Sequence, residues 1–245
     1  MDFDYIIKIK ELIETIESSE KENMEQCVDV LVKAIEHEKS IYIFGASHAG
    51  ILTQEAFYRA GGLIVVNPIF APEVSVERDP ITLTSKMERL EGYGDNIAST
   101  VPFVEDDVLI VHSVSGRNPI TIEIAKAAKD KGVTVIGITN VQYSKSVTSR
   151  HSSGKKMYEY CDIVLDNHGD IGDACVQVQN APQKVGPTST VIGTTMMNAI
   201  FVETAKKLAD KGDAIPVFAS ANMDGGDEFN KNLFKKYLKM IHYRY

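Results

Sequence analysis

Two serines and a glycine at the end of a short apolar run form the chemically most suggestive stretch of the chain. Ser113 and Ser115 lie where the strand predicted from the apolar run 108–111 stops, and Gly116 allows a tight turn. Pro119 suits the first turn of a helix, because its missing N–H would have no partner there. Hydroxyls, free backbone N–H groups and the positive end of a helix dipole suit a phosphate. We therefore predict a phosphate-binding strand–loop–helix, the alternative being hydroxyls that only cap the helix.

Two further loops of small and hydroxyl residues open helical patterns. The first contains Ser47 and His48 and leads into a helix that begins near residue 51. The second contains Thr188 and Ser189 and leads into a long apolar helix, predicted over residues 190–209. The chain therefore repeats the arrangement of small residues before a helix at three places.

A parallel sheet is the element that would bring these loops together. Short apolar or β-rich runs alternate with helical patterns five times, which predicts an α/β fold. With right-handed crossovers, this is a doubly wound, five-stranded parallel sheet with helices on both faces, a three-layer arrangement. The predicted strands are residues 40–44, 63–66, 108–111, 133–138 and 163–165. Ligands of such sheets bind outside the carboxyl ends of the strands, where the polar loops fall.

The remaining segments have weaker patterns. Residues 3–39 predict two amphipathic helices with a break at Ser18-Ser19, which pack on the core or on a partner subunit. Residues 67–100 contain three prolines and predict a lid or binding excursion, with a short helix at 85–90 and a turn at 92–95.

Composition excludes several classes of protein. The 34 acidic and 26 basic residues give a net charge of −8, which argues against a nucleic-acid partner or an anionic membrane surface. No stretch reaches the ~18 apolar residues of a membrane span, and we find no secretory pattern. Three irregularly spaced cysteines predict packing residues in a reducing cytoplasm. They are Cys27, Cys161 and Cys175.

The three loops together resemble the SIS (sugar isomerase) domain family of phosphosugar isomerases and phosphosugar-binding proteins. The motifs are residues 44–50, 113–118 and 186–190, and the resemblance covers about residues 35–210. It implies a phosphosugar-binding domain over residues 40–245 after a helical segment 1–39. It also implies a homodimer or homotetramer with active sites at subunit interfaces. The helix pair and the tail look similar to a subgroup related to phosphoheptose isomerase and to N-acetylmuramic acid 6-phosphate etherase.

The resemblance also implies roles for individual residues. The phosphate ligands would be Ser47, Ser113, Ser115 and Thr188 or Ser189, with Gly116 and Asn118 shaping the second loop. Arg117 stands where many relatives carry a small or hydroxyl residue. A catalytic glutamate on the helix after the first loop would fall near Glu55.

Each candidate for proton transfer has a plain structural alternative. Proton abstraction beside a carbonyl requires a carboxylate with a raised pKa, and Glu55 is one candidate for it. Its plain alternative is a solvated surface group. Glu228, which follows a Gly-rich loop, is its rival. His48 and His112 adjoin phosphate loops and are either acid–base groups or hydrogen-bonded residues at strand ends.

Two other segments carry polar chemistry. Metal-ligating residue types occur on the loop after the fifth strand, namely Asp166, His168, Asp170 and Asp173. Turn-forming Asp and Gly explain this loop as well, and we expect no metal. The basic segment 144–156, with Arg150, is either a secondary phosphate contact or a surface loop.

Taken with the resemblance, these features predict a cytoplasmic phosphosugar isomerase that needs no cofactor, because an ene-diol route returns both electrons to the substrate. A lyase or etherase would begin with the same proton abstraction. A phosphosugar sensor without catalysis is the alternative from another class.

Overall fold

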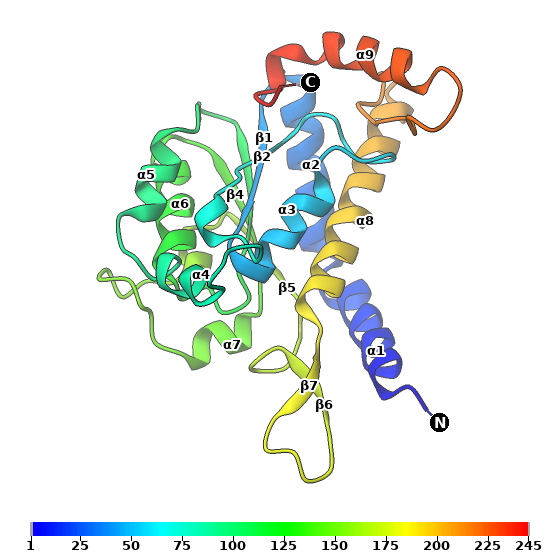
Figure 1. Cartoon of the computed structure of the whole chain (residues 1–245). Helices are drawn as coiled ribbons and strands as arrows, with labels where there is room; N and C mark the ends of the chain where they lie inside the picture. Colours follow the sequence, from blue (N-terminus) through cyan, green and yellow to red (C-terminus); the bar gives the residue numbers. More distant parts are fainter. Residues whose placement is uncertain (1, 245) are drawn as a thin grey trace.

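A five-stranded parallel sheet forms the centre of the computed structural model, which describes residues 2–244 (Figure 1). The strand order is β2-β1-β3-β4-β5, and every neighbouring pair is parallel. The strands are β1 (Ile41–Gly45), β2 (Val66–Pro68), β3 (Val108–His112), β4 (Thr134–Thr139) and β5 (Ile163–Asp166). The predicted doubly wound sheet is confirmed.

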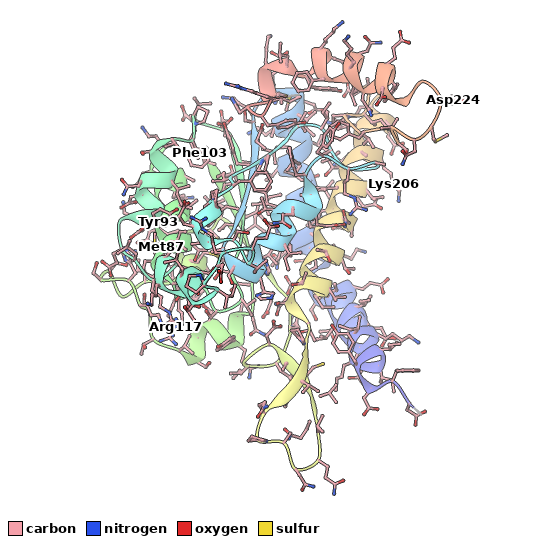
Figure 2. All side chains as sticks on the ribbon, viewed as in Figure 1. Met87, Tyr93, Phe103, Arg117, Lys206 and Asp224 are labelled. Atoms are coloured by element: carbon pink, nitrogen blue, oxygen red, sulfur yellow. The ribbon has the colours of Figure 1, made fainter. Side chains whose placement is uncertain are left out.

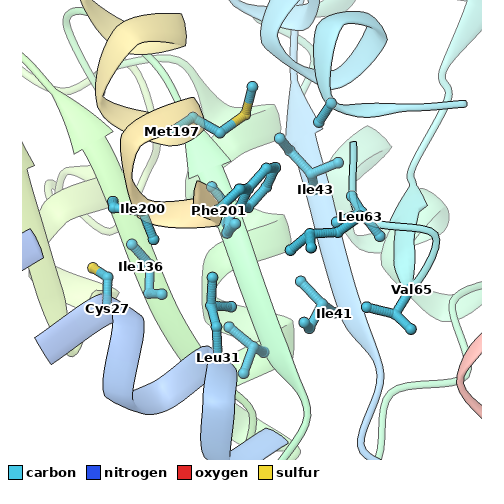
Figure 3. Close-up of a cluster of buried hydrophobic side chains, with 14 of the residues drawn as sticks. Cys27, Leu31, Ile41, Ile43, Leu63, Val65, Ile136, Met197, Ile200 and Phe201 are labelled. Carbon is cyan, nitrogen blue, oxygen red and sulfur yellow. The ribbon is translucent and has the colours of Figure 1, made fainter. Parts of the chain in front are cut away.

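Helices cover both faces of the sheet. Alternate side chains of a strand point to opposite faces, so Ile41 and Ile43 of β1 lie in one apolar cluster and Tyr42 and Phe44 in the other. The first face packs against α2 (Lys21–Glu36), α3 (Ile51–Ala56) and α8 (Ser189–Asp210). Figure 3 shows this packing, with Phe201 of α8 beside the strands. The second face packs against α5 (Tyr93–Ser99) and α6 (Pro119–Asp130).

The predicted pair of N-terminal helices is present, and it shares the core of the sheet. α1 (Asp4–Ser19) ends at Ser19, and Glu20 alone separates it from α2. Cys27 and Leu31 of α2 are buried in the first apolar cluster. α1 continues beside α8 toward the lower end of the molecule in Figure 1. Between residues 2 and 244, no helix is long and apolar enough to cross a membrane.

The strand after the first helix begins later than the apolar run predicts. Leu63 and Ile64 are buried but precede β2, whose ladder with β1 starts at Val66. Leu63 instead forms an isolated antiparallel bridge with Val217, and the N–H of Ile64 donates to the carbonyl of Pro216. The apolar run is therefore covered by a segment about 150 residues away in sequence, which local hydropathy does not reveal.

The predicted turn at residues 92–95 is the beginning of α5. The carboxylate of Glu123, a residue only 2% exposed, accepts hydrogen bonds from the N–H groups of Gly92 (2.6 Å) and Gly94 (2.7 Å). It supplies from α6 the acceptor that a capping side chain normally supplies locally. A Cβ on Gly94 would lie 2.5 Å from the carbonyl oxygen of Ile120, so this close approach requires glycine.

A β-hairpin replaces the loop predicted before the long helix. β6 (Ala174–Gln177) pairs antiparallel with β7 (Lys184–Pro187) and projects from the lower end of the molecule in Figure 1. The predicted helix at 85–90 is α4 (Thr82–Met87), and part of the basic segment is α7 (Val141–Ser146). The other elements are α9 (Gly226–Lys236) and the 3₁₀ helices η1 (Ser47–Gly50), η2 (Pro72–Val74), η3 (Met157–Tyr160) and η4 (Leu238–Met240).

Candidate functional site

The crevice between the ends of β1 and β3 is where this topology places a ligand. β1 and β3 are neighbours in the sheet, but the chain runs from β1 toward β2 on one side and from β3 toward β4 on the other. The loops that follow the two strands therefore diverge. Gly45, the last residue of β1, pairs with His112, the last residue of β3. Ser47 and Ser113 therefore follow neighbouring strand ends, and the structure brings the two predicted serine loops together.

The loop after β1 is a tight turn that depends on its glycines. A Cβ on Gly45 would lie 2.3 Å from the carbonyl oxygen of Ala49, and a Cβ on Gly50 would lie 2.8 Å from the carbonyl oxygen of Gly45. Ser47 has a φ of 57°, in the left-handed region that non-glycine residues rarely adopt. Such backbone strain clusters at ligand-binding sites, which is consistent with a functional role for this loop.

The loop after β3 is held in shape by its own backbone and by a neighbouring loop. The N–H of Gly116 donates to the hydroxyl of Ser113 (3.2 Å), and Gly116 has a φ of 56°. Asn118 stands at the N-cap of α6 but makes no side-chain cap. Its Oδ1 instead accepts a hydrogen bond from the guanidinium of Arg150 (2.8 Å). The alternative of hydroxyls that only cap α6 therefore finds no support in these contacts.

A cavity of about 320 Å³ opens beside Ser47. One wall comes from η1 and α3 and contains Thr53 and Gln54; the other comes from residues 69–78, part of the predicted binding excursion. Thr53 is 2% exposed, and its hydroxyl has no hydrogen-bond partner among residues 2–244. The Nε atom of Arg78, in the opposite wall, is likewise buried and unpartnered within the described chain.

Buried polar atoms without a partner are rare in folded proteins, because each one loses its hydrogen bonds to water. Two such residues, Thr53 and Arg78, line this one cavity. The sequence did not point to Thr53 or Arg78, since a Thr within a helix and an Arg in a Pro-rich segment carry no motif.

The predicted base Glu55 lies on α3 but does not line this cavity. Its carboxylate accepts from the guanidinium of Arg59, one helical turn away, and from the side-chain amide of Asn198 on α8 (3.4 Å). The carboxylate is about one-third exposed. Glu77 is the carboxylate in the wall of the cavity.

The two candidate histidines differ in environment. His48 is exposed on η1, directly after Ser47. His112 is fully buried, and its Nδ1 lies 3.1 Å from the carbonyl oxygen of Ala49. Burial lowers the pKa of His112, and the contact with the Ala49 carbonyl opposes this shift. His112 is therefore a neutral group that ties the end of β3 to η1.

Thr188 and Ser189 already have an internal anion as their partner. The carboxylate of Asp173 accepts from the backbone N–H groups of Thr188 (3.1 Å) and Ser189 (2.8 Å). It also accepts from the hydroxyl of Ser189 (2.7 Å). The N-terminus of α8, where a phosphate was predicted, is thus capped from the base of the β6–β7 hairpin. Asp173 precedes the helix by 16 residues, so no local capping pattern reveals it.

Glu228 is not brought to this site. It lies exposed on α9, which Figure 1 shows at the end of the molecule opposite the β6–β7 hairpin. Asp224, just before α9, is labelled at that end in Figure 2, whereas Arg117 is labelled in the lower half of the molecule, above the hairpin. Tyr237, next to α9, lines a hollow with Glu36 and Glu38, which precede β1. The C-terminal end of α9 therefore lies near the amino end of β1.

The residues with metal-ligating chemistry have separate partners. Asp166 accepts from the N–H groups of Val141 (3.1 Å) and His168 (3.0 Å). His168 contacts Glu20 (2.9 Å), and Asp170 pairs with Lys184 (2.6 Å). Over residues 2–244, no three His, Cys, Asp or Glu side chains are grouped so that they could hold a metal ion. All three cysteines are free, and burial raises the pKa of the Cys27 and Cys161 thiols to about 12, which makes them poor nucleophiles.

Comparison with known proteins identifies the family. A UPF0309 protein from Shouchella clausii is 50% identical over 239 residues (98% of this chain, 97% of the relative), and one from Oceanobacillus iheyensis is 46% identical over 240 residues (98% of each). The phosphoheptose isomerase of Neisseria gonorrhoeae has a similar fold, with a TM-score of 0.54 at 14% identity over 82% of this chain and 93% of that one. The SIS domain pattern matches residues 4–140, more than half of the sequence. The chain therefore belongs to the SIS domain family.

Proposed function

We propose that the protein is a phosphosugar isomerase whose phosphate site is formed by Ser47, Ser113 and Ser115, with Gly116 and Asn118 shaping the second loop. The observation that carries the proposal is the meeting of the two serine loops beside a cavity with unpartnered buried polar atoms. Similarity in fold to phosphoheptose isomerases supports it.

In this proposal the phosphate occupies the crevice between β1 and β3, and the sugar extends into the cavity. The hydroxyl of Thr53 and the guanidinium of Arg78 then hydrogen-bond sugar hydroxyl or carbonyl oxygens. Thr188 and Ser189 contribute by holding Asp173 rather than the phosphate. The phosphate therefore sits on the β3 side of the crevice.

Aldose–ketose interconversion requires a base that removes the proton beside the carbonyl and returns it to the neighbouring carbon. We propose Glu55 as this base and His48 as the donor to the carbonyl oxygen, with Glu77 as the competing base because it lines the cavity. The same proton abstraction would begin a lyase or etherase reaction.

A sensor without catalysis is favoured by one observation. The Glu55 carboxylate contacts Arg59 and Asn198, and neither of these residues lines the cavity. A ligand in the cavity would then be bound without a base beside its reacting carbon.

Thermal-shift screening against hexose, heptose and amino-sugar phosphates identifies the ligand, and NMR in deuterated water then follows exchange of the proton at C2. Exchange that is lost in Glu55→Gln and kept in Glu77→Gln supports the isomerase with Glu55 as base. The reverse pattern assigns the base to Glu77. Binding without any exchange refutes the isomerase and leaves the sensor. Ser115→Ala is expected to weaken binding at least about tenfold, since a hydrogen bond to a charged group contributes about 1.5–3 kcal/mol.

The proposal includes a homodimer or homotetramer in the cytoplasm. Phe3, Ile6, Ile7 and Ile13 are exposed apolar residues of α1 and the residue before it, which supports burial of this surface in an assembly. Light scattering of the purified chain would give the monomer mass if this part of the proposal is wrong.

A further inference from the structure

Three arginines from separate segments gather on the outer side of the loop after β3. They are Arg89, which follows α4, Arg117 of the loop itself, and Arg150, between α7 and η3. The N–H of Arg150 donates to the carbonyl of Arg117 (2.9 Å), and the guanidinium of Arg117 donates to the hydroxyl of Thr148 (3.2 Å). Two short chain segments that each carry an arginine are thus fastened side by side.

The third arginine is brought in by contacts on either side of it. The carbonyl of Glu88 accepts from the N–H of Ile120 in the first turn of α6 (3.4 Å). The carboxylate of Glu91 accepts from the N–H of Ser152 (2.6 Å). Arg89 therefore lies between the start of α6 and the segment of Arg150. The residues Arg89, Arg117 and Arg150 are called the arginine triad below.

The triad carries a local positive charge that is poorly balanced. The sequence has six arginines; Arg59 and Arg78 are ion-paired with Glu55 and Glu73. No carboxylate oxygen of the described chain lies within 4.0 Å of a triad guanidinium nitrogen. This is unusual in a chain with a net charge of −8.

Arg150 lies close enough to the other two guanidinium groups to be repelled by their charges. Burial lowers the pKa of Arg150, and the charges of Arg117 and Arg89 lower it further. Glu88 is the nearby acid; burial raises the pKa of its carboxyl, whereas a hydrogen bond from Asn118 and the charges of Arg89 and Arg150 lower it. The Nε atom of Arg117 is buried and unpartnered within residues 2–244. An arrangement of like charges with an unused donor is relieved when an oxyanion binds between them.

We propose that the arginine triad is a second anion site, which binds a phosphate-type dianion beside the serine loops. Planar guanidinium groups form paired hydrogen bonds with phosphate oxygens, and the positive end of the α6 dipole adds to their attraction. The site is separate from the phosphate site proposed for Ser47, Ser113 and Ser115. Its anion is either the second phosphoryl group of a sugar bisphosphate or a free phosphate.

Isothermal titration of the full chain with inorganic phosphate tests the site. Arg89→Gln is the cleanest variant, because Arg117 belongs to the serine loop and Arg150 hydrogen-bonds to Asn118 of that loop, whereas Arg89 follows α4. It is expected to weaken phosphate binding about tenfold, the effect of losing one charge-assisted hydrogen bond. Arg244→Gln removes the same charge from an exposed position near the C-terminus and is expected to change affinity by less than about twofold.

Two further arms make the outcome decisive. Arg150→Lys keeps the positive charge but loses the paired N–H donors of the guanidinium, and it is expected to weaken phosphate binding. An unchanged melting temperature of this variant shows that its fold is intact. Ser115→Ala is expected to leave the triad's phosphate binding in place, so failure of the proposed function and failure of this inference are separable. Equal effects of Arg89→Gln and Arg244→Gln, or no binding by the wild type, would overturn the proposal.

The source of the anion is found by comparing fructose 6-phosphate with fructose 1,6-bisphosphate. If the triad takes a second phosphoryl group of one ligand, the bisphosphate binds more tightly than the monophosphate, and Arg89→Gln removes the difference. If it takes a free phosphate, inorganic phosphate binds to the protein saturated with the monophosphate, and Arg89→Gln weakens that binding.

Discussion

Removing the carboxylate of Asp173 is expected to destabilise the protein and to open the N-terminus of α8 to anions. The carboxylate accepts three hydrogen bonds from Thr188 and Ser189 and faces the positive end of a 22-residue helix. Loss of a helix cap costs about 0.5–2 kcal/mol, and loss of the charge interaction with the dipole costs about 0.3–1 kcal/mol. Asp173→Asn keeps one acceptor oxygen and loses the charge, so we expect a loss of about 1 kcal/mol.

Asp173→Ala loses both the capping hydrogen bonds and the charge interaction with the helix dipole, and it also introduces backbone strain. Asp173 has a φ of 73°, where alanine is disfavoured by about 1 kcal/mol relative to residues that tolerate the left-handed region. Together these effects are expected to lower the free energy of unfolding by about 3 kcal/mol, which urea denaturation measures. For a chain of this size, each kcal/mol lowers the melting temperature by about 2–4 °C.

The matched control is Asp170→Asn. Asp170 pairs with Lys184 in the same hairpin region, but both side chains are more than 40% exposed, and such pairs contribute about 0–1 kcal/mol. Inorganic phosphate is expected to raise the melting temperature of Asp173→Ala more than that of the wild type, because a free helix N-terminus binds anions. Equal stability of the Asp173 and Asp170 variants would refute this account of the α8 N-terminus.

Three other substitutions test the positions of buried groups. His112→Gln is expected to flatten the pH dependence of stability. Because burial lowers the pKa of His112 in the folded protein, the unfolded chain takes up the proton first, and wild-type stability falls as pH drops below about 6.5. Unfolding free energies at pH 5 and pH 7.5 measure this difference. Glu123→Gln is expected to lower the free energy of unfolding by about 1–3 kcal/mol in urea denaturation, because one amide oxygen replaces a carboxylate that serves two glycine N–H groups. Gly45→Ala places a Cβ 2.3 Å from the Ala49 carbonyl oxygen and is expected to lower the free energy of unfolding by about 1–3 kcal/mol. It is also expected to weaken sugar-phosphate binding. Denaturation and titration measure the two effects, and wild-type values of both would contradict the tight-turn interpretation.

The sheet and the serine loops follow from the sequence because their causes are local. The run Val108–His112 is buried on both faces of the sheet. Glycines are required in residues 45–50, because the chain turns there immediately after the end of a strand. Strand-end position in a parallel sheet then places both serine loops at one edge of the sheet, and the observed pairing of β1 with β3 makes Ser47 and Ser113 neighbours.

The parts that the sequence did not reveal depend on partners distant in the chain. Glu123 caps α5 from 31 residues away, and Asp173 caps α8 from a hairpin that was expected to be a loop. The orientation of Glu55 toward Asn198 is set by the packing of α3 on α8, 143 residues apart. A side chain that satisfies a helix end from another element leaves no spacing pattern to read.

The two helix N-termini at this end of the sheet are in opposite states, and this difference orients a ligand. The N-terminus of α8 is neutralised by Asp173, so an anion there meets a carboxylate rather than free N–H groups. The N-terminus of α6 has no side-chain cap and lies beside Arg117 and Arg150, so the electrostatic gradient across the crevice favours an anion on the β3 side. In the proposed isomerase, a sugar phosphate held by the serine loops would direct its uncharged part past Ser47 into the cavity of Thr53 and Arg78. Asp173→Ala should weaken this preference, because it removes the carboxylate that repels an anion from the N-terminus of α8.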